Sequence, residues 1–287
     1  MKLFGTDFAI SGSLKNFTMK TRIFLVIALS LKLIPGFAQL RVEKNEAFQK
    51  GEFLRYKAYY DAVLTGEVIA GSCTFEVKDE NKKINNRDTY HIEVVGKTKG
   101  AFNWFFRVYD RYETFVDQET LAPWLFMRRV DEGGYIINQD ITFNQNKNVA
   151  YFVDNKTTRT ANVPTPEYVH DLLSAIYYCR TLDISKMDVN GDFRVKFMLD
   201  DTIYTTKVIY MGKETIKTSF GKVRCIKIKP QVLTGTVFKD PYPVLIWVTD
   251  DKNRIPIIGE SEVIVGKVKM ELIEYSGIKN PFSSLVK

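Results

Sequence analysis

The residues best suited to catalysis are an acid, a histidine and a serine close together in the sequence. Glu167, His170 and Ser174 stand at positions i, i+3 and i+7, so a helix would place them on one face. A serine nucleophile with a histidine base is the composition of a hydrolase, but it needs a strained, exposed serine and an oxyanion hole. A regular helix supplies neither. We therefore interpret the three residues as the polar side of an amphipathic helix and keep an envelope hydrolase as the less favoured alternative.

Other signatures of catalysis are missing from the sequence. It contains no G-x-S-x-G, no H-E-x-x-H and no C-x-x-C motif. The 2 histidines and 3 cysteines leave few ligands for a metal site. We therefore expect a protein that is not an enzyme and that has no metal and no cofactor. We expect Cys73, Cys179 and Cys225 to be buried thiols, with one disulfide and one leftover thiol as the alternative.

A cluster of aromatic residues is the most informative feature for binding. The rings follow Lys97-Thr98-Lys99-Gly100 and break strict alternation, so both faces of the chain carry them. They fit either core packing between sheets or the apolar wall of a ligand cavity. With two residues of the helix described below, the candidate ligand-binding residues are Phe102, Trp104, Phe105, Phe106, Tyr109, Leu173 and Tyr177.

The N-terminal region has the build of a secretory signal peptide. Basic residues at 19–22 precede an apolar run at 23–31, and a Pro-Gly break leads to Ala38. We expect cleavage after Ala38, residues 1–18 to be an over-extended start, residues 19–38 to be the signal peptide, and the mature protein to lie in the periplasm of a Gram-negative bacterium. The apolar run is too short to span a membrane, so we expect no transmembrane span. A buried helix or an uncleaved anchor is the alternative.

The charge argues against a nucleic-acid partner once the leader is removed. The whole chain has 287 residues, 45% of them hydrophobic, and a formal net charge of +7. Residues 1–38 hold five of the 41 Lys and Arg and one of the 34 Asp and Glu, so the remainder carries +3. Its cations alternate with other residues along strands and form no block. We expect a globular domain with an ample core and no affinity for nucleic acid.

A hydrophobic period of two dominates from Gly51 onward and predicts strands. One face of the first predicted strand carries Leu54, Tyr56, Ala58 and Tyr60. Further strands are expected over residues 72–77, 90–95, 108–116, 124–130, 135–143, 149–153, 193–199, 203–210, 223–228, 244–248 and 263–275. Short polar turns separate them, which predicts a mainly β fold: a curved antiparallel sheet or half-open β-barrel-like structure.

One segment departs from the strand pattern and predicts a helix. Thr165 is a candidate N-cap, Pro166 suits the first helical position, and Glu167 adds an acid to the first turn. Apolar residues then follow at helical spacing from Val169 to Tyr177. We expect a helix over 166–181 that joins halves at about 48–160 and 185–278 within a single exported domain at 39–287. It should pack on, or plug, the concave side of the sheet.

The two halves share a short pattern. Asp117 precedes Pro123 by six residues, and Asp250 precedes Pro256 by the same number, each between two expected strands. The Asp side chain is expected to cap the backbone of the turn, and the Pro to begin the next strand where no donor is needed. A structural repeat and a hairpin motif used twice by chance both remain open.

Several motifs together resemble one family of bacterial exported proteins. They are Gly51-Glu52-x-Leu54-x-Tyr56, Gly66 and Gly71, the run from Asp171 to Arg180, Phe220-Gly221-Lys222, and Pro243-Val244-Leu245-Ile246-Trp247 with Arg254-Ile255-Pro256. The sequence is similar to domain of unknown function 3108 from about Gly51 to Tyr275. The resemblance rests on glycines, turns and a helix face, and it implies no catalytic residue.

A second resemblance covers one hairpin. The turn from Asp250 to Pro256 is similar to one in LolA-type lipoprotein carriers, whose half-open β-barrel holds acyl chains under a helical lid. Together these features favour a non-enzymatic periplasmic protein that binds an apolar or lipid-like small molecule or an envelope protein. A scaffold for outer-membrane machinery is the alternative.

Overall fold

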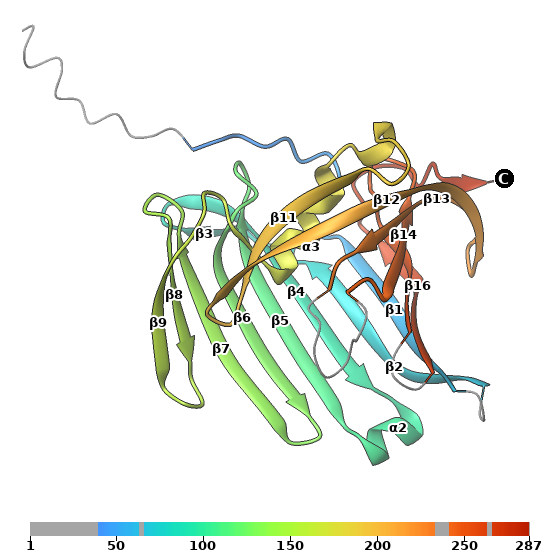
Figure 1. Ribbon diagram of the computed structural model, residues 1–287, viewed down its shortest axis with the longest axis horizontal. Helices are drawn as coiled ribbons and strands as arrows, with labels where there is room; N and C mark the ends of the chain where they lie inside the picture. Colours follow the sequence, from blue (N-terminus) through green and yellow to red (C-terminus); the bar gives the residue numbers. More distant parts are fainter. Residues whose placement is uncertain (1–39, 63–65, 233–240, 263–265, 287) are drawn as a thin grey trace, which may run out of the picture. The chain divides into compact units, whose positions relative to one another are not determined.

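The computed structural model describes residues 40–62, 66–232, 241–262 and 266–286. The expected start and signal peptide at residues 1–38, and the first residues of the strand expected at 263–275, lie outside these ranges. The segment from Leu40 to Lys287 forms one compact unit, whose described part is mostly β (Figure 1). No helix in the described ranges is long and apolar enough to cross a membrane.

The secondary structure follows the predicted alternation closely. The N-terminal half contains β1 (Phe53–Ala62), β2 (Gly66–Val77), β3 (Lys82–Ile84), β4 (Arg87–Thr98), α2 (Gly100–Phe105), β5 (Val108–Asp117), β6 (Pro123–Glu132), β7 (Tyr135–Asn144), β8 (Val149–Asp154) and β9 (Arg159–Pro164). Between the halves lie β10 (His170–Asp171), α3 (Leu172–Thr181) and the 3-10 helix η2 (Ile184–Lys186). The C-terminal half contains β11 (Asp192–Leu199), β12 (Thr202–Thr218), β13 (Gly221–Pro230), β14 (Val244–Thr249), β15 (Pro256–Glu262), β16 (Lys267–Ser276) and β17 (Leu285–Val286).

These strands belong to one sheet with β1 near its middle. From β1 the neighbours run through β2, β4, β5, β6, β7 and β8 to β9. On its other side they run through β16, β15, β14, β13, β12 and β11 to β10. All these pairs are antiparallel except β10 with β11. No pairing joins β9 to β10 in the described ranges, so the predicted half-open β-barrel-like sheet is confirmed.

Turn residues explain why the strands reverse where they do. Asn85 and Asn86 join β3 to β4 with φ angles of 52° and 62°, the left-handed conformation that a two-residue hairpin turn requires. Gly133 and Gly134 do the same between β6 and β7, with φ angles of 58° and 91°. The short polar turns seen in the sequence therefore set the strand order of each half.

The helix predicted over 166–181 is shorter than expected. It begins at Leu172 because Asp171 is its N-cap: the carboxylate accepts hydrogen bonds from the backbone N–H of Leu173 (2.8 Å) and Ser174 (2.9 Å). Upstream, Tyr168 has a φ of 52°, which a helix excludes, and β10 pairs with β11. The capping pattern around Thr165 was therefore misleading, since the strand pairing of β10 overrides it.

The core consists of several apolar clusters, and α3 contributes to more than one of them. Leu173 packs with Phe126, Phe152 and Met198. Tyr177 packs in another cluster with Phe48. The helix contacts β5 on one side and β11 on the other, as Figure 1 shows, so it lies inside the curve of the sheet as predicted.

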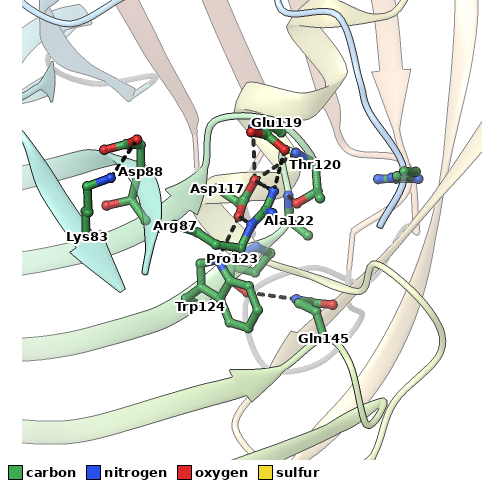
Figure 2. Close-up of polar contacts among 12 residues, drawn as sticks. Lys83, Arg87, Asp88, Asp117, Glu119, Thr120, Ala122, Pro123, Trp124 and Gln145 are labelled. Carbon is green, nitrogen blue, oxygen red and sulfur yellow. Dashed lines mark hydrogen bonds and ion pairs between the residues drawn. The ribbon is translucent and has the colours of Figure 1, made fainter. Parts of the chain in front are cut away.

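The hairpins of the Asp–Pro pattern share a backbone geometry but not a cap. In both, the register shifts opposite the proline, and Leu121 and Arg254 adopt φ angles of 57° and 44°. The Asp117 carboxylate accepts hydrogen bonds from the backbone N–H of Thr120 and the indole of Trp124, and it pairs with Arg87 (Figure 2). The expected cap at Asp250 is wrong.

Asp251, one residue later, caps the second turn instead. Its carboxylate accepts from the Asn253 backbone N–H (3.0 Å) and from the Thr249 hydroxyl (2.8 Å). The Asp250 side chain points to an ion pair with Lys213 (3.0 Å). In the first loop Pro123 pairs with Val116, the residue just before Asp117. In the second loop Pro256 pairs with Val248, two residues before Asp250, so the capping acid is the next residue, Asp251.

Candidate ligand-binding site

A second apolar face of α3 turns toward the C-terminal half of the sheet, where Ala175 packs with Val195 and Phe197 of β11. Leu172, Ala175, Ile176 and Cys179 follow at the spacing of one helix face, opposite to Leu173 and Tyr177. Ile176 remains 37% exposed. Asp171 fixes the start of this face, and the basic Arg180 lies in the last turn. The helix thus presents two apolar faces, one packed in the core and one turned to the C-terminal half.

The C-terminal half of the sheet supplies the facing wall. In β11 the alternate residues Phe193, Val195, Phe197 and Leu199 line it, because successive side chains of a strand point to opposite faces. The strands β12, β13 and β14 continue the same apolar surface with Val208, Ile228, Pro230, Val244, Ile246 and Val248. Arg194 and Lys196, between the lining residues of β11, are exposed.

A cavity of about 390 Å³ lies between this face of α3 and strands β11 to β14; we call it the helix cavity. Its volume falls in the range of about 300–1,000 Å³ that small-molecule sites occupy. Its lining is almost entirely apolar, and Thr206 and Gln231 are its uncharged polar members. Such a lining offers much burial and few hydrogen bonds, which suits an apolar ligand.

The charges of the two arginines in the lining, Arg180 and Arg254, are paired with protein carboxylates. Arg180 forms an ion pair with Glu52, and its Nε donates to the carbonyl oxygen of Asn253 (3.1 Å). The Nη1 of Arg254 donates to the carbonyl oxygen of Arg180 (3.2 Å), and its Nη2 lies 3.4 Å from the Asp183 carboxylate. These contacts pair both charges with protein carboxylates, while the buried Nε of Arg254 has no hydrogen-bond partner within the described structure.

The predicted aromatic residues lie elsewhere. Trp104 is 81% exposed and Phe105 is 76% exposed, both on the short helix α2 that joins β4 to β5. Phe106 and Tyr109 are also exposed, and Phe102 contacts Tyr60 with a ring distance of 6.1 Å. None of them lines the helix cavity. They are not the core residues of the other interpretation either, because four of them are exposed and Phe102 is only half-buried.

The two predicted helix residues are not brought together with these aromatics. Leu173 and Tyr177 are buried in separate core clusters on the face of α3 that points away from the helix cavity. The single wall predicted from these seven residues is therefore not formed. Helical spacing predicted Leu172 and Ile176 on one buried face with Leu173 and Tyr177. The structure instead places Leu172 and Ile176 on a second face, with Ala175 and Cys179, that lines the helix cavity.

The acid, histidine and serine considered for catalysis have structural roles. The Ser174 hydroxyl accepts a hydrogen bond from the Asp171 backbone N–H (2.9 Å), which completes a capping box. His170 is buried and stacked on Tyr178 at a ring distance of 4.6 Å, while Glu167 is exposed. No hydrogen bond joins His170 to Ser174 in the described structure. Burial, reinforced by the charge of Arg41, lowers the pKa of His170 to about 3.

The cysteines and potential metal ligands offer no reactive centre. Cys73, Cys179 and Cys225 are all free thiols, and burial raises the pKa of each to about 12. A thiol of that pKa is protonated at neutral pH and is a poor nucleophile. Among the described residues, no group of three or more His, Cys, Asp or Glu side chains is placed to hold a metal ion.

The fold and the helix cavity define a β-barrel-like protein with an internal apolar site. A solved structure with this architecture is the β-barrel-like protein of domain of unknown function DUF1849 from Brucella abortus. It is 10% identical, has a TM-score of 0.53, and the match covers 81% of this chain and 99% of that one. The likeness at this identity is one of fold.

The chain itself belongs to the family DUF3108, described as protein of unknown function, whose model matches residues 55–273. The resemblance drawn from the sequence motifs is thus confirmed. No curated protein matches the chain in sequence.

Two further solved structures match over most of the chain at low TM-scores. A protein from Parabacteroides distasonis, provisionally described as a lipoprotein, is 14% identical with a TM-score of 0.34, over 80% of this chain and 97% of its own. A protein from Bacteroides fragilis, provisionally described as exported and with a YmcC-like fold, is 12% identical with a TM-score of 0.29, over 83% and 99%.

Proposed function

We propose that this protein is a non-enzymatic component of the bacterial cell envelope that holds an apolar, lipid-like ligand in the helix cavity. The observation that carries the proposal is the lining: apolar side chains of α3 face apolar side chains of β11 to β14 across about 390 Å³. Removing apolar surface from water contributes about 25 cal/mol per Å², so a ligand of this kind gains affinity from burial alone.

The ligand class follows from the charges around the site. The charges of Arg180 and Arg254 are already paired with Glu52 and Asp183. A ligand in the helix cavity therefore needs no charged group to pair with them. An acyl chain or a similarly narrow hydrocarbon fits this description. The exposed Ile176 at the helix surface marks a side from which such a chain enters, with any polar head left in water.

The absence of catalysis is part of the proposal. The Ser174 hydroxyl is committed to the cap of α3, and the His170 ring is buried in a stack with Tyr178, so neither group meets the other or faces the helix cavity. The envelope location rests on the signal-peptide pattern at residues 19–38. Fractionation of cells and N-terminal sequencing test it: we expect periplasmic protein that begins at Gln39.

Native mass spectrometry of the gently purified protein, followed by organic extraction, is the direct test. We expect a co-purified apolar molecule. A clean mass of the protein alone, with a stable envelope partner recovered by crosslinking, would overturn the ligand proposal and favour the scaffold.

A binding assay with a matched pair of variants assigns the ligand to the helix cavity. The probe is cis-parinaric acid, a fluorescent fatty acid. Ile176→Asp places a charge in the apolar lining at an exposed position and is expected to weaken binding by about tenfold or more. Val189→Asp makes the same change at a position that is 59% exposed and outside the lining, and binding should be retained. Equal effects of the two variants would contradict the assignment.

A further inference from the structure

An exposed apolar surface lies at one end of the sheet, away from the helix cavity. Trp104, Phe105, Phe106, Tyr109, Tyr135 and Ile136 are 81%, 76%, 51%, 48%, 64% and 39% exposed. We call these six residues the aromatic tip. In Figure 1, α2 lies beyond the lower ends of β4 and β5, so the tip protrudes from the sheet. Soluble proteins rarely expose several large apolar side chains together unless the surface meets a partner or a membrane.

Strand pairing brings the three segments of the aromatic tip together. Tyr109 and Ile136 both pair with Asp131, and Tyr135 pairs with Glu132. The ring of Phe106 lies against Gly133, so closely that a side chain there would collide with it. The rings of Trp104 and Phe105 lie 4.6 Å apart. The tip is therefore made by α2, the start of β5 and the hairpin between β6 and β7 at one end of the sheet, with Tyr109 and Ile136 on one face and Tyr135 on the other.

The tip is held in place by hydrogen bonds behind it. The Thr98 hydroxyl accepts from the Val108 backbone N–H (2.9 Å) and donates to the Asn103 side chain (3.2 Å), which closes the loop that carries α2. The Lys99 backbone N–H donates to the carbonyl oxygen of Ala70 on β2 (3.0 Å). The aromatic rings are thus presented outward by an ordered support.

The charges around the tip are positive where the rings are most exposed. Residues 97–109 contain Lys97, Lys99 and Arg107 and no acid. All three cations are exposed, and none forms an ion pair within the described structure. Three acids lie on the adjoining strands: the Asp131 carboxylate accepts from the Gly134 backbone N–H (3.3 Å), and Glu132 shares a hydrogen bond with Asp110. The loop that carries the most exposed rings is therefore positive and favours an anionic surface, while the acids belong to β5 and β6.

We propose that the aromatic tip docks this protein on an anionic phospholipid bilayer, with Trp104 and Phe105 entering the interface and Lys97, Lys99 and Arg107 meeting the headgroups. Tryptophan and tyrosine prefer the boundary between headgroups and acyl chains, and each nearby Lys or Arg adds attraction to anionic lipids. A protruding apolar tip enters such an interface directly, whereas a protein partner would need a matching groove. The proposal is independent of the ligand in the helix cavity.

Vesicle sedimentation tests the docking. The sample is the compact unit of residues 40–287, which contains every core cluster and lacks the apolar leader. Vesicles of phosphatidylcholine and phosphatidylglycerol should bind it, and binding should weaken in high salt and without phosphatidylglycerol. Trp104→Asp with Phe105→Asp should lower the partition coefficient by about tenfold or more. The matched control, Tyr151→Asp with Val189→Asp, changes two other exposed apolar residues and should bind as the parent does.

Trp104 gives a reading from the tip itself. It is the exposed tryptophan, since Trp124 and Trp247 are 2% and 8% exposed. Bilayers with brominated acyl chains should quench its fluorescence, and Trp104→Phe should abolish that quenching. Failure of the parent to bind anionic vesicles, or equal binding by the tip variant and its control, overturns the proposal. A concentration-dependent mass that only the tip variant loses, without vesicle binding, would overturn it too and assign the surface to a second copy.

Discussion

Inside the core, both Nη atoms of the Arg180 guanidinium bind the carboxylate of Glu52. Its Nη1 lies 2.6 Å from Oε1 and its Nη2 lies 2.8 Å from Oε2, and the side chains are 4% and 0% exposed. Arg180 belongs to the last turn of α3, and Glu52 directly precedes β1. This pair therefore ties the helix to the middle of the sheet and fixes one end of the helix cavity.

Breaking that pair should be costly. Arg180→Met leaves the Glu52 carboxylate buried without a partner, which destabilises a protein by about 3–5 kcal/mol. The measurement is the free energy of unfolding in urea. Arg55→Met removes the exposed pair with Glu274, whose side chains are 41% and 50% exposed, and should cost less than about 1 kcal/mol. Similar losses in the two variants would show that the buried pair has no special role.

His170 should make the protein sensitive to acid. Its pKa is about 3 in the folded chain, because burial and Arg41 oppose the charged ring, against about 6.5 when unfolded. The unfolded chain therefore takes up a proton first, and stability is complete above pH 6.5 and declines toward pH 3, by about 4–5 kcal/mol. His170→Phe should remove this decline in pH-dependent urea unfolding. If the stability of the His170→Phe variant still declines from pH 6.5 toward pH 3 as in the parent, the decline does not come from His170.

Asp171, the next residue, acts in the opposite direction. Burial raises its pKa to about 6, although hydrogen bonds from Thr114, Ser174 and Leu173 lower it. The folded state then holds the proton more tightly than the unfolded state, so stability is greatest below about pH 4 and is lost as pH rises to about 6, by about 3 kcal/mol. Asp171→Asn keeps an N-cap oxygen and should abolish this loss. We would measure it in a His170→Phe background, where the opposing titration is absent.

Asp117 should matter far more than Asp250, although both fit the same sequence pattern. Asp117→Ala leaves the Trp124 indole and the backbone N–H of Thr120 without their acceptor and frees Arg87, at a cost of about 3 kcal/mol or more. Asp250→Ala removes an outlying pair with Lys213 and should cost less than about 1 kcal/mol. Thermal unfolding of the two variants decides; equal shifts in Tm would contradict the difference in their caps.

Filling the helix cavity should separate binding from stability. Ala175 packs with Val195 and Phe197 but also lines the helix cavity, so Ala175→Leu should weaken binding of cis-parinaric acid at a smaller cost in stability than the same change in a cluster without a cavity. Ala150→Leu adds the same bulk to a packed cluster and should cost about 1–3 kcal/mol. If both substitutions destabilise the protein alike, the space beside Ala175 is not available to a ligand.

The sheet could be predicted from the sequence because its signal is local. Alternation along residues such as Phe193, Val195 and Phe197 reports which face of a strand is apolar, and paired asparagines or glycines report the turns. The start of α3 could not be predicted, because Asp171 and Thr165 are competing candidate N-caps. The choice between them depends on the pairing of β10 with β11, which lies about 25 residues further along the chain.

The candidate site was beyond sequence reasoning for a different reason. The spacing of Leu172, Ala175, Ile176 and Cys179 is visible in the sequence, yet nothing there says that β11 to β14 pass over this face and leave a gap. The aromatic run at 102–109 does not line the helix cavity, because the short helix α2 leaves Trp104 and Phe105 exposed. Pairing between strands far apart in the sequence decides where both features lie, and a hydrophobic pattern does not show that pairing.

The central place of β1 governs the order in which the molecule is assembled. Its partner β2 follows directly, but its other partner, β16, spans Lys267–Ser276, more than 200 residues later. Each half is otherwise a succession of neighbouring hairpins that close as soon as they are synthesised. One edge of β1 therefore stays unpaired until β16, near the C-terminal end of the sheet, is available to pair with it. Contacts of such long range slow folding, and an unpaired edge invites other strands, so this seam is the step at which a chaperone has most to protect.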